Sequence, residues 1–313
     1  MKTLPPSLLL TVMYLTSLSG LRSQIGRILR GGDGTYSPGE PVYDVVPPGR
    51  CQFGEDWSTC KLLKVEACSP DTKVFTFALP DGNKPLNLPT CGCLLVSGGR
   101  DSSNDGEPFV RPYTPVSTNN LVGKVELMVK IYPGGNLSRV FGEMNVGDEL
   151  DFKHTKFNVK KQYADFKNKN KNICMIVGGT GITPMIQALH AILGNPNDDT
   201  KVTMLYGSRT QDSIIARETL RKWSDSSGGQ LTVIDVLSAE PEGSDWEGRR
   251  GFVDGPLIRE NFPGCDCPLV GPPLVFVCGP PAMYEAVCGP REEAEVKGVL
   301  GEMGFGEDMV VKF

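Results

Sequence analysis

The sequence is poor in the residues that carry most acid–base and metal chemistry. Only two of its 313 residues are histidine. No two cysteines have the C-x-x-C spacing of zinc, redox or haem-attachment motifs, and the spacing of a plant-type iron–sulfur site is also absent. The two C-x-C pairs, Cys91/Cys93 and Cys265/Cys267, have no matching histidine nearby. We therefore expect no metal centre, and the scattered thiols favour reduced cysteines in an intracellular protein.

An excess of positive charge is missing as well. The formal net charge is −5 and the pI is about 5.3, whereas a nucleic-acid-binding domain is typically basic. We therefore expect no nucleic-acid partner. With 39% hydrophobic and 22% charged residues the chain can form a packed core, and its length favours about two domains.

Charge is also missing from the N-terminal segment Leu4–Leu21, a run of about 18 residues. Such a segment is either a targeting peptide that is cleaved or a membrane anchor. Arg22, Arg27 and Arg30 follow it, so the positive-inside rule would keep the rest of the chain on the cytosolic side. Residues 31–50 are rich in Gly and Pro and are predicted to be a linker.

The middle of the chain has the pattern of short antiparallel strands. Residues 60–80 alternate apolar and polar side chains and are interrupted by a Ser-Pro-Asp turn, which predicts two paired strands. Residues 92–99, 120–132 and 147–159 continue the pattern with Gly and Pro between them. This spacing predicts a small closed or nearly closed β-barrel.

After about residue 170 the pattern changes to buried strands that alternate with helices. Continuous apolar runs at 172–177, 201–207, 231–238 and 273–279 predict strands. Helical periodicity follows the first two, at 183–194 and 213–225, which predicts a parallel sheet with helices on both faces. The predicted fold is a two-domain α+β protein: a tail (1–50), an antiparallel β-barrel (51–168) and an α/β domain (169–313).

Three glycines stand between the first of these strands and its helix. Gly178, Gly179 and Gly181 would lie at the carboxyl edge of the sheet, where ligands bind in open parallel sheets. Bare backbone there allows close approach, and amides at the start of a helix favour an anion such as a dinucleotide pyrophosphate. The spacing G-G-x-G differs from the G-x-G-x-x-G fingerprint, so a tight turn without a ligand is the alternative.

Three further motifs point to the same kind of ligand. In "RPYTPVS" (111–117) an arginine suits a phosphate, and a tyrosine two residues on shares its strand face and can lie on a flat ring. "KIYPGGNLS" (130–138) has the composition of a phosphate-binding turn before a helix. "CGPPAM" (278–283) turns at the end of a buried strand. Together these motifs predict one ligand site built from both domains.

These motifs resemble those of the ferredoxin–NADP reductase superfamily, most closely its NADH–cytochrome b5 reductase branch. The resemblance runs from about Trp57 to the terminal Lys-Phe pair, an ending shared with the mitochondrial-type members. It implies a six-stranded FAD-binding barrel followed by a nicotinamide-nucleotide domain. The implied activity is transfer of a hydride from NADH to FAD, and then of single electrons to a haem protein such as cytochrome b5. It also implies a monomer associated with a membrane, facing the cytosol at the endoplasmic reticulum or lying at the mitochondrial outer membrane or intermembrane space.

The resemblance also assigns residues to roles. Thr114 would lie near flavin N5 and Cys278 beside the nicotinamide, which makes these two the implied catalytic positions. Arg111 would hold the FAD pyrophosphate and Tyr113 would pack on the flavin. The other cofactor-binding positions that it implies are Pro112, Met128, Lys130, Tyr132, Gly135, Asn136, Leu137, Ser138, Gly178, Gly179, Thr180, Gly181, Thr183, Ser208, Arg209, Gly279, Pro280, Met283 and Phe313.

Two features leave alternatives open. The run 153–171 holds seven lysines and one acid, and is either a solvated connection or an electrostatic docking site for an acidic cytochrome b5. At Asp212-Ser213, NADH-preferring relatives often have two acids, or an acid at the second position. Arg209 nearby could receive the 2′-phosphate of NADPH. The remainder of the chain favours NADH, with NADPH as the alternative.

The remaining expectations are structural or concern rival functions. His154 and His190, the latter at a polar helix position, are expected to be structural, and His154-Thr155 replaces the Gly-Pro of most family members. A reductase component that serves an oxygenase, desaturase or nitrate-reductase-like system is the alternative function. A flavin-binding scaffold without activity is a further one, although all the motifs are intact.

Overall fold

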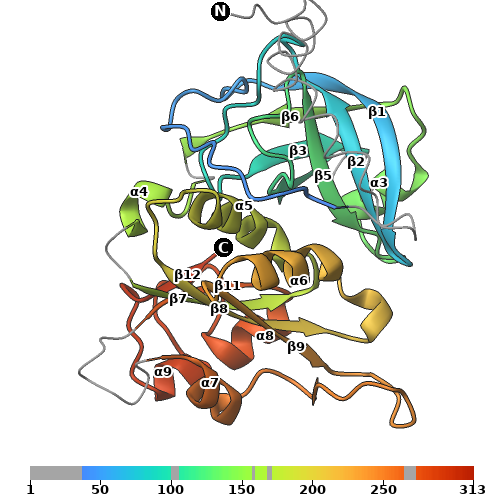
Figure 1. Cartoon of the computed structure of the whole chain (residues 1–313). Coiled ribbons are helices and arrows are strands. Elements are labelled where there is room, and N and C mark those ends of the chain that lie inside the picture. The colour runs from blue at the N-terminus through green and yellow to red at the C-terminus, as the bar shows by residue number, and fades with distance from the viewer. Residues whose placement is uncertain (1–36, 100–105, 157–158, 168–170, 264–272) are drawn as a thin grey trace, which may run out of the picture.

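The computed structural model describes residues 37–99, 106–156, 159–167, 171–263 and 273–313, which form two six-stranded sheets. Figure 1 shows the antiparallel sheet above and the parallel sheet, with its helices, below. The apolar segment Leu4–Leu21 and the pair Cys265/Cys267 lie outside these residues. Within them, no helix has both the length and the apolar character needed to cross a bilayer.

The first sheet is entirely antiparallel, in the order β4-β3-β6-β1-β2-β5. The predicted hairpin at 60–80 is confirmed, since Ser69 pairs with Thr72 across the turn. Just past β4, the amide of Val116 donates to the carbonyl of Glu126 on β5 at 2.9 Å, which brings the two ends of the sheet together. The strands are β1 (Ser58–Ser69), β2 (Thr72–Ala78), β3 (Leu94–Gly98), β4 (Phe109–Tyr113), β5 (Lys124–Lys130) and β6 (Glu149–Lys153).

Aromatic side chains fill this curled sheet. Helix α3 (Leu137–Glu143) inserts Phe141, whose ring lies 4.9 Å from that of Phe75 and 6.2 Å from that of Phe77. All three rings are fully buried. Edge-to-face packing of this kind adds about 0.5–1.5 kcal/mol per pair to the burial of the rings. The helix that follows the predicted phosphate turn is therefore held firmly against the barrel.

The second sheet is entirely parallel, in the order β10-β9-β8-β7-β11-β12. Its strands are β7 (Asn172–Gly178), β8 (Lys201–Ser208), β9 (Leu231–Leu237), β10 (Arg249–Arg250), β11 (Leu274–Cys278) and β12 (Val310–Lys312). The helices near it are α4 (Tyr163–Phe166), α5 (Ile182–Leu193), α6 (Arg217–Ser226), α7 (Gly255–Asn261), α8 (Pro281–Val287) and α9 (Gly298–Glu302), with 3-10 turns η2 (Gly179–Gly181) and η3 (Gln211–Ser213).

Both faces of the parallel sheet are covered, as predicted. Along β7, Ile173, Met175 and Val177 join the apolar cluster formed with α5 and α6, whereas Cys174 and Ile176 join the cluster formed with α7, α8 and α9. The first cluster also contains barrel residues, among them Val74 and Met128. The core is therefore continuous across the domain boundary, which fixes the two sheets relative to each other.

The predicted helix at 213–225 begins later than expected, at Arg217. Ala216, just before it, has a left-handed backbone (φ 56°), which breaks the helical path. Ile214 and Ile215 are buried before the helix begins. The apolar pattern that they create in the sequence therefore reflects packing in the core and not one face of a helix. Helices α4, α7, α8 and α9 and strands β10 and β12 were not predicted, because each is too short to show periodicity.

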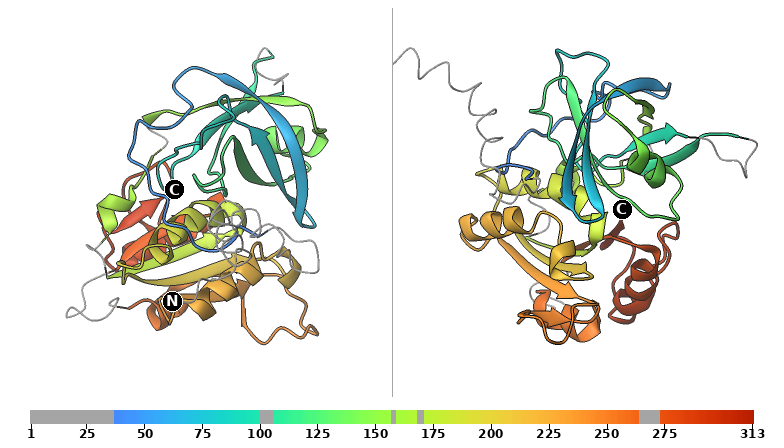
Figure 2. Two further views of the ribbon diagram at one scale, coloured as in Figure 1. Left: turned by 45° about the horizontal axis from the view of Figure 1, so that its top comes forward. Right: turned by 90° about the vertical axis from the view of Figure 1, so that its right-hand side faces the viewer.

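The predicted linker packs across both domains from residue 37 onward. The indole of Trp223 on α6 donates to the carbonyl of Gly39 at 3.0 Å, and the amide of Val42 donates to Nδ1 of His190 on α5 at 3.1 Å. Two residues on, Asn119 of the barrel donates to the carbonyl of Asp44 at 3.2 Å. The segment, the bluest part of the described chain in Figure 2, therefore links the α5–α6 face to the barrel.

His190, which the sequence places at a polar position of its helix, is buried and has the structural role expected for it. It is only 2% exposed, and its ring lies 4.9 Å from that of Trp223 at 68°. Burial lowers its pKa from 6.5 to about 4, so the imidazole is neutral at physiological pH. Its Nδ1 accepts the Val42 hydrogen bond only in that state, which makes it a structural residue.

This burial predicts acid sensitivity. The pKa of His190 in the folded state lies below the unfolded value, so its contribution is complete above pH 6.5 and is lost as the pH falls toward 4. We expect the free energy of unfolding to fall by about 2 kcal/mol between pH 7 and pH 5 from this group alone. Urea titrations of the wild type and of His190→Asn, which keeps an acceptor but cannot titrate, measure the difference. Equal pH dependence in both would contradict the assignment.

Candidate functional site

The three predicted glycines lie at the point where the order of the parallel sheet reverses. Strand β8 follows β7 on one side and β11 lies on the other, so the turns after β7 and β11 are neighbours. A Cβ added at Gly181 would lie 2.0 Å from the carbonyl oxygen of Cys278. One at Gly279 would lie 2.2 Å from the Met283 side chain. Gly181 is therefore required because the two turns touch, whereas the side chain that a residue larger than Gly279 would meet is the flexible end of Met283.

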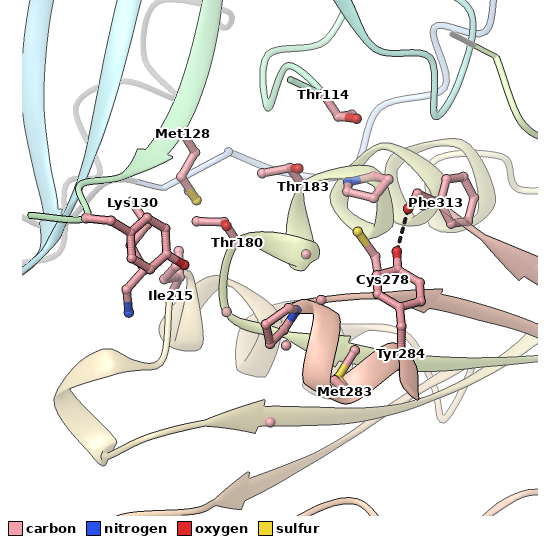
Figure 3. A pocket seen from close by; sticks show the side chains of 18 of the residues that line it. Thr114, Met128, Lys130, Thr180, Thr183, Ile215, Cys278, Met283, Tyr284 and Phe313 are labelled. Atoms are coloured by element: carbon pink, nitrogen blue, oxygen red, sulfur yellow. Dashed lines mark hydrogen bonds between the residues drawn. The ribbon is translucent and has the colours of Figure 1, made fainter. Parts of the chain in front are cut away.

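Gly179 differs from its neighbours. Its φ of 52° is left-handed, and a Cβ there would meet nothing within 4 Å. Its backbone therefore faces open space, and this space is a cavity of about 1350 Å³ between the two domains. Every cofactor-binding and catalytic residue predicted from the sequence lines this cavity. Figure 3 shows Thr114 and Met128 reaching it from the barrel, and Thr180, Thr183, Cys278 and Phe313 from the other domain.

The barrel wall of the cavity carries Arg111 and Tyr113, which share one face of β4 as predicted. Arg111 is exposed, and its guanidinium donates to the carbonyl of Val110 at 2.7 Å. The ring of Tyr113 packs edge-on to Phe141 at 5.3 Å. Burial raises the pKa of Tyr113 to about 12, so the phenol stays neutral. The pair therefore offers a cation beside a flat apolar face.

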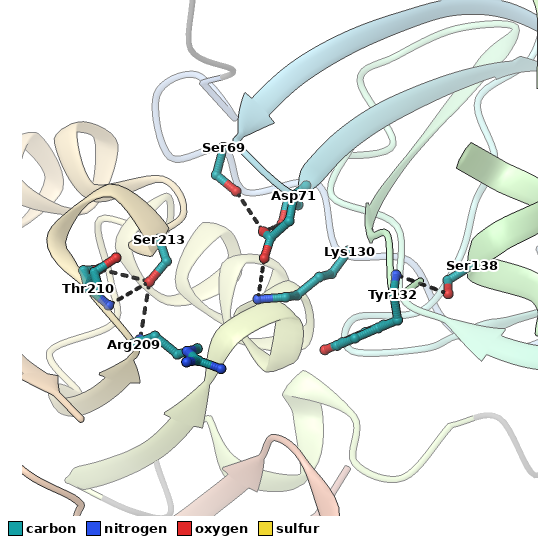
Figure 4. A network of polar contacts seen from close by, with 9 residues as sticks. Ser69, Asp71, Lys130, Tyr132, Ser138, Arg209, Thr210 and Ser213 are labelled. Carbon is teal, nitrogen blue, oxygen red and sulfur yellow. Dashed lines mark hydrogen bonds and ion pairs between the residues drawn. The ribbon is translucent and has the colours of Figure 1, made fainter. Parts of the chain in front are cut away.

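Lys130 also lines this wall, but its charge is already engaged. Its ammonium lies 2.7 Å from the carboxylate of Asp71, which also accepts hydrogen bonds from Ser69 and Thr72. Figure 4 shows this pair facing Arg209 of the other domain across the cavity. Ser138 Oγ accepts a hydrogen bond from the amide of Tyr132 at 3.4 Å, which closes the Gly-Gly turn.

The opposite end of the cavity is shaped by the last residue. The amide of Phe313 donates to the carbonyl of Val277 at 3.0 Å, and its carbonyl accepts the hydroxyl of Tyr284. Lys312 anchors the same segment by donating to the carbonyls of Pro290, Glu293 and Glu295 at 2.8–2.9 Å. The chain terminus is thus a fixed part of the wall.

Cys278 lies at this end and is a neutral thiol, because burial raises its pKa to about 11. Such a thiol is a poor nucleophile at neutral pH. Cys91 and Cys93 also line the cavity and are likewise free. Over the described ranges, no group of three or more His, Cys, Asp or Glu residues could hold a metal ion. The chemistry of the cavity therefore depends on what it binds.

The lining is strongly cationic. Among the described residues it holds five basic side chains against one side-chain carboxylate, that of Asp71; the bases are Arg111, Lys130, Lys160, Arg209 and Arg291. The side chain of Ser208 is only 9% exposed, and its hydroxyl has no hydrogen-bond partner in the described structure. A multiply charged anion with hydrogen-bonding groups is the ligand that such a lining favours.

Several residues that line the cavity were not predicted from the sequence. Lys160 and Arg291 flank the cavity from the two domains, and Phe252 is 80% exposed beside it. The available signal for Phe252 was a large aromatic residue among glycines and charged residues in "RRGFVDG", since an aromatic residue at the surface often contacts a ligand. The two cations lie in irregular segments, where no periodicity fixes the direction of a side chain.

Two known protein families match the chain, one over the barrel and one over the parallel sheet. Residues 59–160 match the family model of an oxidoreductase FAD-binding domain, and residues 175–289 match that of an oxidoreductase NAD-binding domain. Relatives named NADH-cytochrome b5 reductase 2 cover most of the chain. The protein of Aspergillus clavatus is 35% identical over 89% of this chain and 84% of its own length. That of Yarrowia lipolytica is 37% identical over 83% and 87%.

Solved structures share the fold. The cytochrome b5 reductase domain of Ulva prolifera nitrate reductase aligns with a TM-score of 0.67 at 27% identity, over 83% of this chain and 97% of that one. The CS-b5R domains of human Ncb5or align with a TM-score of 0.65 at 24% identity, over 82% and 68%. These likenesses confirm the predicted two-domain fold.

The contact between the two turns makes a prediction about the glycines. Gly181→Ala would drive a Cβ into the backbone of Cys278, and we expect a loss of about 3 kcal/mol in the free energy of unfolding. Gly179→Ala, the matched control, strains only its own backbone and should lose about 1 kcal/mol. Urea unfolding of both variants measures this. Equal losses would show that the turns are not in contact.

Proposed function

The chain belongs to the NADH–cytochrome b5 reductase family, and we propose that it carries electrons from NADH, through bound FAD, to cytochrome b5 or a similar small haem protein. The observation that carries the proposal is the meeting of the "RPYT" strand of the barrel with two glycine turns of the parallel sheet in one cavity. The chain is an oxidoreductase with FAD-binding and NAD-binding domains.

The cavity fits both cofactors. Its volume of about 1350 Å³ exceeds the roughly 300–1,000 Å³ of ordinary ligand pockets, so it has room for two nucleotides. Its five basic side chains suit two pyrophosphates, and the bare backbone of Gly179 allows one of them to approach closely. When bound, FAD supplies the step from a two-electron donor to a one-electron acceptor.

Residues of the barrel hold the flavin cofactor in this proposal. The Arg111 guanidinium binds a pyrophosphate, and the neutral ring of Tyr113, braced by Phe141, lies against a flat ring. Ser138 and the turn before it bind phosphate from the other side. Thr114 of the barrel and Thr183 of α5 bring hydroxyls to the cavity from opposite domains. Orientation, and not acid–base catalysis, is the work of these residues.

Residues of the parallel sheet hold the nicotinamide nucleotide. Its pyrophosphate lies on Gly178–Gly181, and the nicotinamide lies by Cys278, whose neutral thiol adds no competing charge. Phe313, fixed by Tyr284 and packed 5.2 Å from Phe276, keeps water from that end. No side chain has to transfer a proton, which agrees with the structural roles of His190 and His154, whose Nδ1 lies 3.1 Å from the carbonyl of Cys93.

The domain borders and the location also belong to the proposal. We place the flavin domain at 51–168 and the nucleotide domain at 169–313, which the family matches support. We also propose that the apolar segment Leu4–Leu21 associates the protein with the endoplasmic reticulum or with mitochondria, on the basis of its sequence alone. Recovery of the full-length protein wholly in the soluble fraction of cells would count against this.

The assignment of Arg111 predicts a specific loss of flavin. Arg111→Ala removes a charge-assisted hydrogen bond, which is worth about 1.5–3 kcal/mol, so the Kd for FAD should rise roughly 10- to 100-fold. Arg139→Ala, on the exposed side of α3 and outside the cavity, is the control and should leave the Kd unchanged. Fluorescence titration of the deflavinated proteins measures both. Unaltered FAD binding by Arg111→Ala would refute its role.

The proposed acceptor is tested by comparing cytochrome b5 with an uncharged quinone. We expect NADH to reduce both, and only the reaction with cytochrome b5 to slow as salt rises, because docking would use the lysines of 153–171. Lys156→Glu should weaken the reaction with cytochrome b5, and Lys222→Glu, an exposed lysine of α6, should not. Quinone reduction without cytochrome b5 reduction would point to the alternative, a reductase component for another acceptor. A salt-independent reaction would leave the lysines as a solvated connection.

A further inference from the structure

The side chain of Gln187 on α5 joins the two domains beside the cavity. Its Nε2 donates a hydrogen bond to the carbonyl of Pro115 at 2.7 Å, and its Oε1 accepts one from the amide of Cys91 at 2.8 Å. Both partners are buried residues of the barrel. The thiol of Cys91 also donates to the carbonyl of Pro184 on α5, with 3.3 Å between sulfur and oxygen. We call this set of contacts the Gln187 bridge.

Each end of the Gln187 bridge lies next to a residue that lines the cavity. On the barrel side, Pro115 directly follows Thr114. On the other side, Gln187 lies one helical turn after Thr183, on the helix that begins at the glycine turn Gly178–Gly181. Thr114 and Thr183 reach the cavity from opposite domains (Figure 3). The bridge therefore connects the strand motif of the barrel to the helix that carries the glycine turn.

The backbone of Cys91 shows that the bridge constrains the barrel. Its φ of 59° is left-handed, a conformation that a residue other than glycine rarely adopts unless its surroundings hold it. Its amide is held by Gln187 and its thiol contacts Pro184, so α5 supplies that support. Ile186 and Leu189, on either side of Gln187, are fully buried, which fixes the helix itself. The barrel segment at Cys91 therefore has little freedom to move relative to the start of α5.

The chemistry of the side chain matches its two partners. A carboxamide has a donor and an acceptor on one planar group and carries no charge, so it pairs with a carbonyl and an N–H group at once. A leucine of similar size would leave Pro115 and Cys91 without these hydrogen bonds. An ionised carboxylate would face the carbonyl of Pro115 with no proton to donate. The bridge therefore depends on the identity of this residue and not only on its size.

We propose that Gln187 is a positioning residue that sets the separation between the barrel wall and the glycine turn, and so the gap between the flavin and the nicotinamide. Gln187 does not itself line the cavity and acts through the backbone of Pro115 and Cys91. Reacting atoms must lie about 3–3.5 Å apart, and a displacement of about 1 Å can cost roughly 100-fold in rate. The inference rests on the proposed function, because it names a residue that places the two cofactors of the same site.

Hydrogen exchange in the purified, flavin-containing protein tests the bridge without turnover. Gln187→Leu removes both hydrogen bonds, and we expect the amide of Cys91 to exchange roughly 10-fold faster. Gln52→Leu is the matched control, because Gln52 accepts from the amide of Asp81 at 3.0 Å and donates to the carbonyls of Lys84 and Pro85 at 2.9 Å, all within the barrel. It should leave the exchange of Cys91 unchanged. Unaltered exchange of Cys91 in Gln187→Leu would overturn the inference.

The rate of flavin reduction by NADH separates positioning from stability. At saturating NADH we expect Gln187→Leu to lower the rate roughly 10- to 100-fold with little change in the KM for NADH, whereas Gln52→Leu should change neither. If NADH reduces the wild-type flavin and Gln187→Leu is equally fast, or Gln52→Leu is equally slowed, this inference alone fails. If NADH does not reduce the wild-type flavin, the proposed function fails, and the exchange of Cys91 still shows whether the bridge is made.

Gln187→Glu gives a signature that a loss of stability would not, and it decides the matter if Gln187→Leu does not fold. The introduced carboxylate repels the carbonyl of Pro115 when ionised, and restores a donor and an acceptor when protonated. Flavin reduction should therefore recover toward the wild-type rate as the pH falls from about 8 to about 5.5. Asp44, His190 and the Cys91 thiol lie near Gln187 in both proteins, so the wild-type pH profile is the control. Parallel profiles for the two proteins would overturn the role of Gln187.

Discussion

The contact between two backbone turns sets the shape of this protein's site. The turn after β7 and the turn after β11 approach so closely that no side chain fits between Gly181 and the carbonyl of Cys278. This contact lies where the order of the parallel sheet reverses, which is where open α/β sheets bind their ligands. It leaves the left-handed Gly179 facing an empty space and brings Cys278 to the edge of the same space. The floor of the cavity is therefore built from backbone, which a ligand can approach closely.

The other walls depend on how the barrel is held above that floor. Val74 and Met128 of the barrel belong to the apolar cluster of the parallel sheet, so the domains share a core and are not only connected by a linker. Residues 37–44 add hydrogen bonds from α5 and α6 to the barrel, and the fixed C-terminus closes one end. These contacts keep Arg111 and Tyr113 on the wall of the cavity that the glycine turns also line.

Much of this could be predicted from the sequence because it follows from local chemistry. Alternating strands, buried strands and glycine turns each have a pattern, and all the residues singled out in the four motifs line one cavity. What failed depends on tertiary packing. Ile214 and Ile215 were predicted to begin a helix but are buried before it begins. His190 was placed at a polar helix position but is buried, where it accepts a hydrogen bond from the Val42 amide. Lys160 and Arg291 lie in irregular segments and carry no periodic signal at all.

We propose that one cavity holds a flavin and a nicotinamide nucleotide in contact. Anaerobic stopped-flow mixing of the purified protein with NADH tests this most directly, with the flavin absorbance as the signal. We expect a yellow protein whose flavin is bleached rapidly by one equivalent of NADH. A colourless protein, or bound flavin that NADH does not reduce, would contradict it.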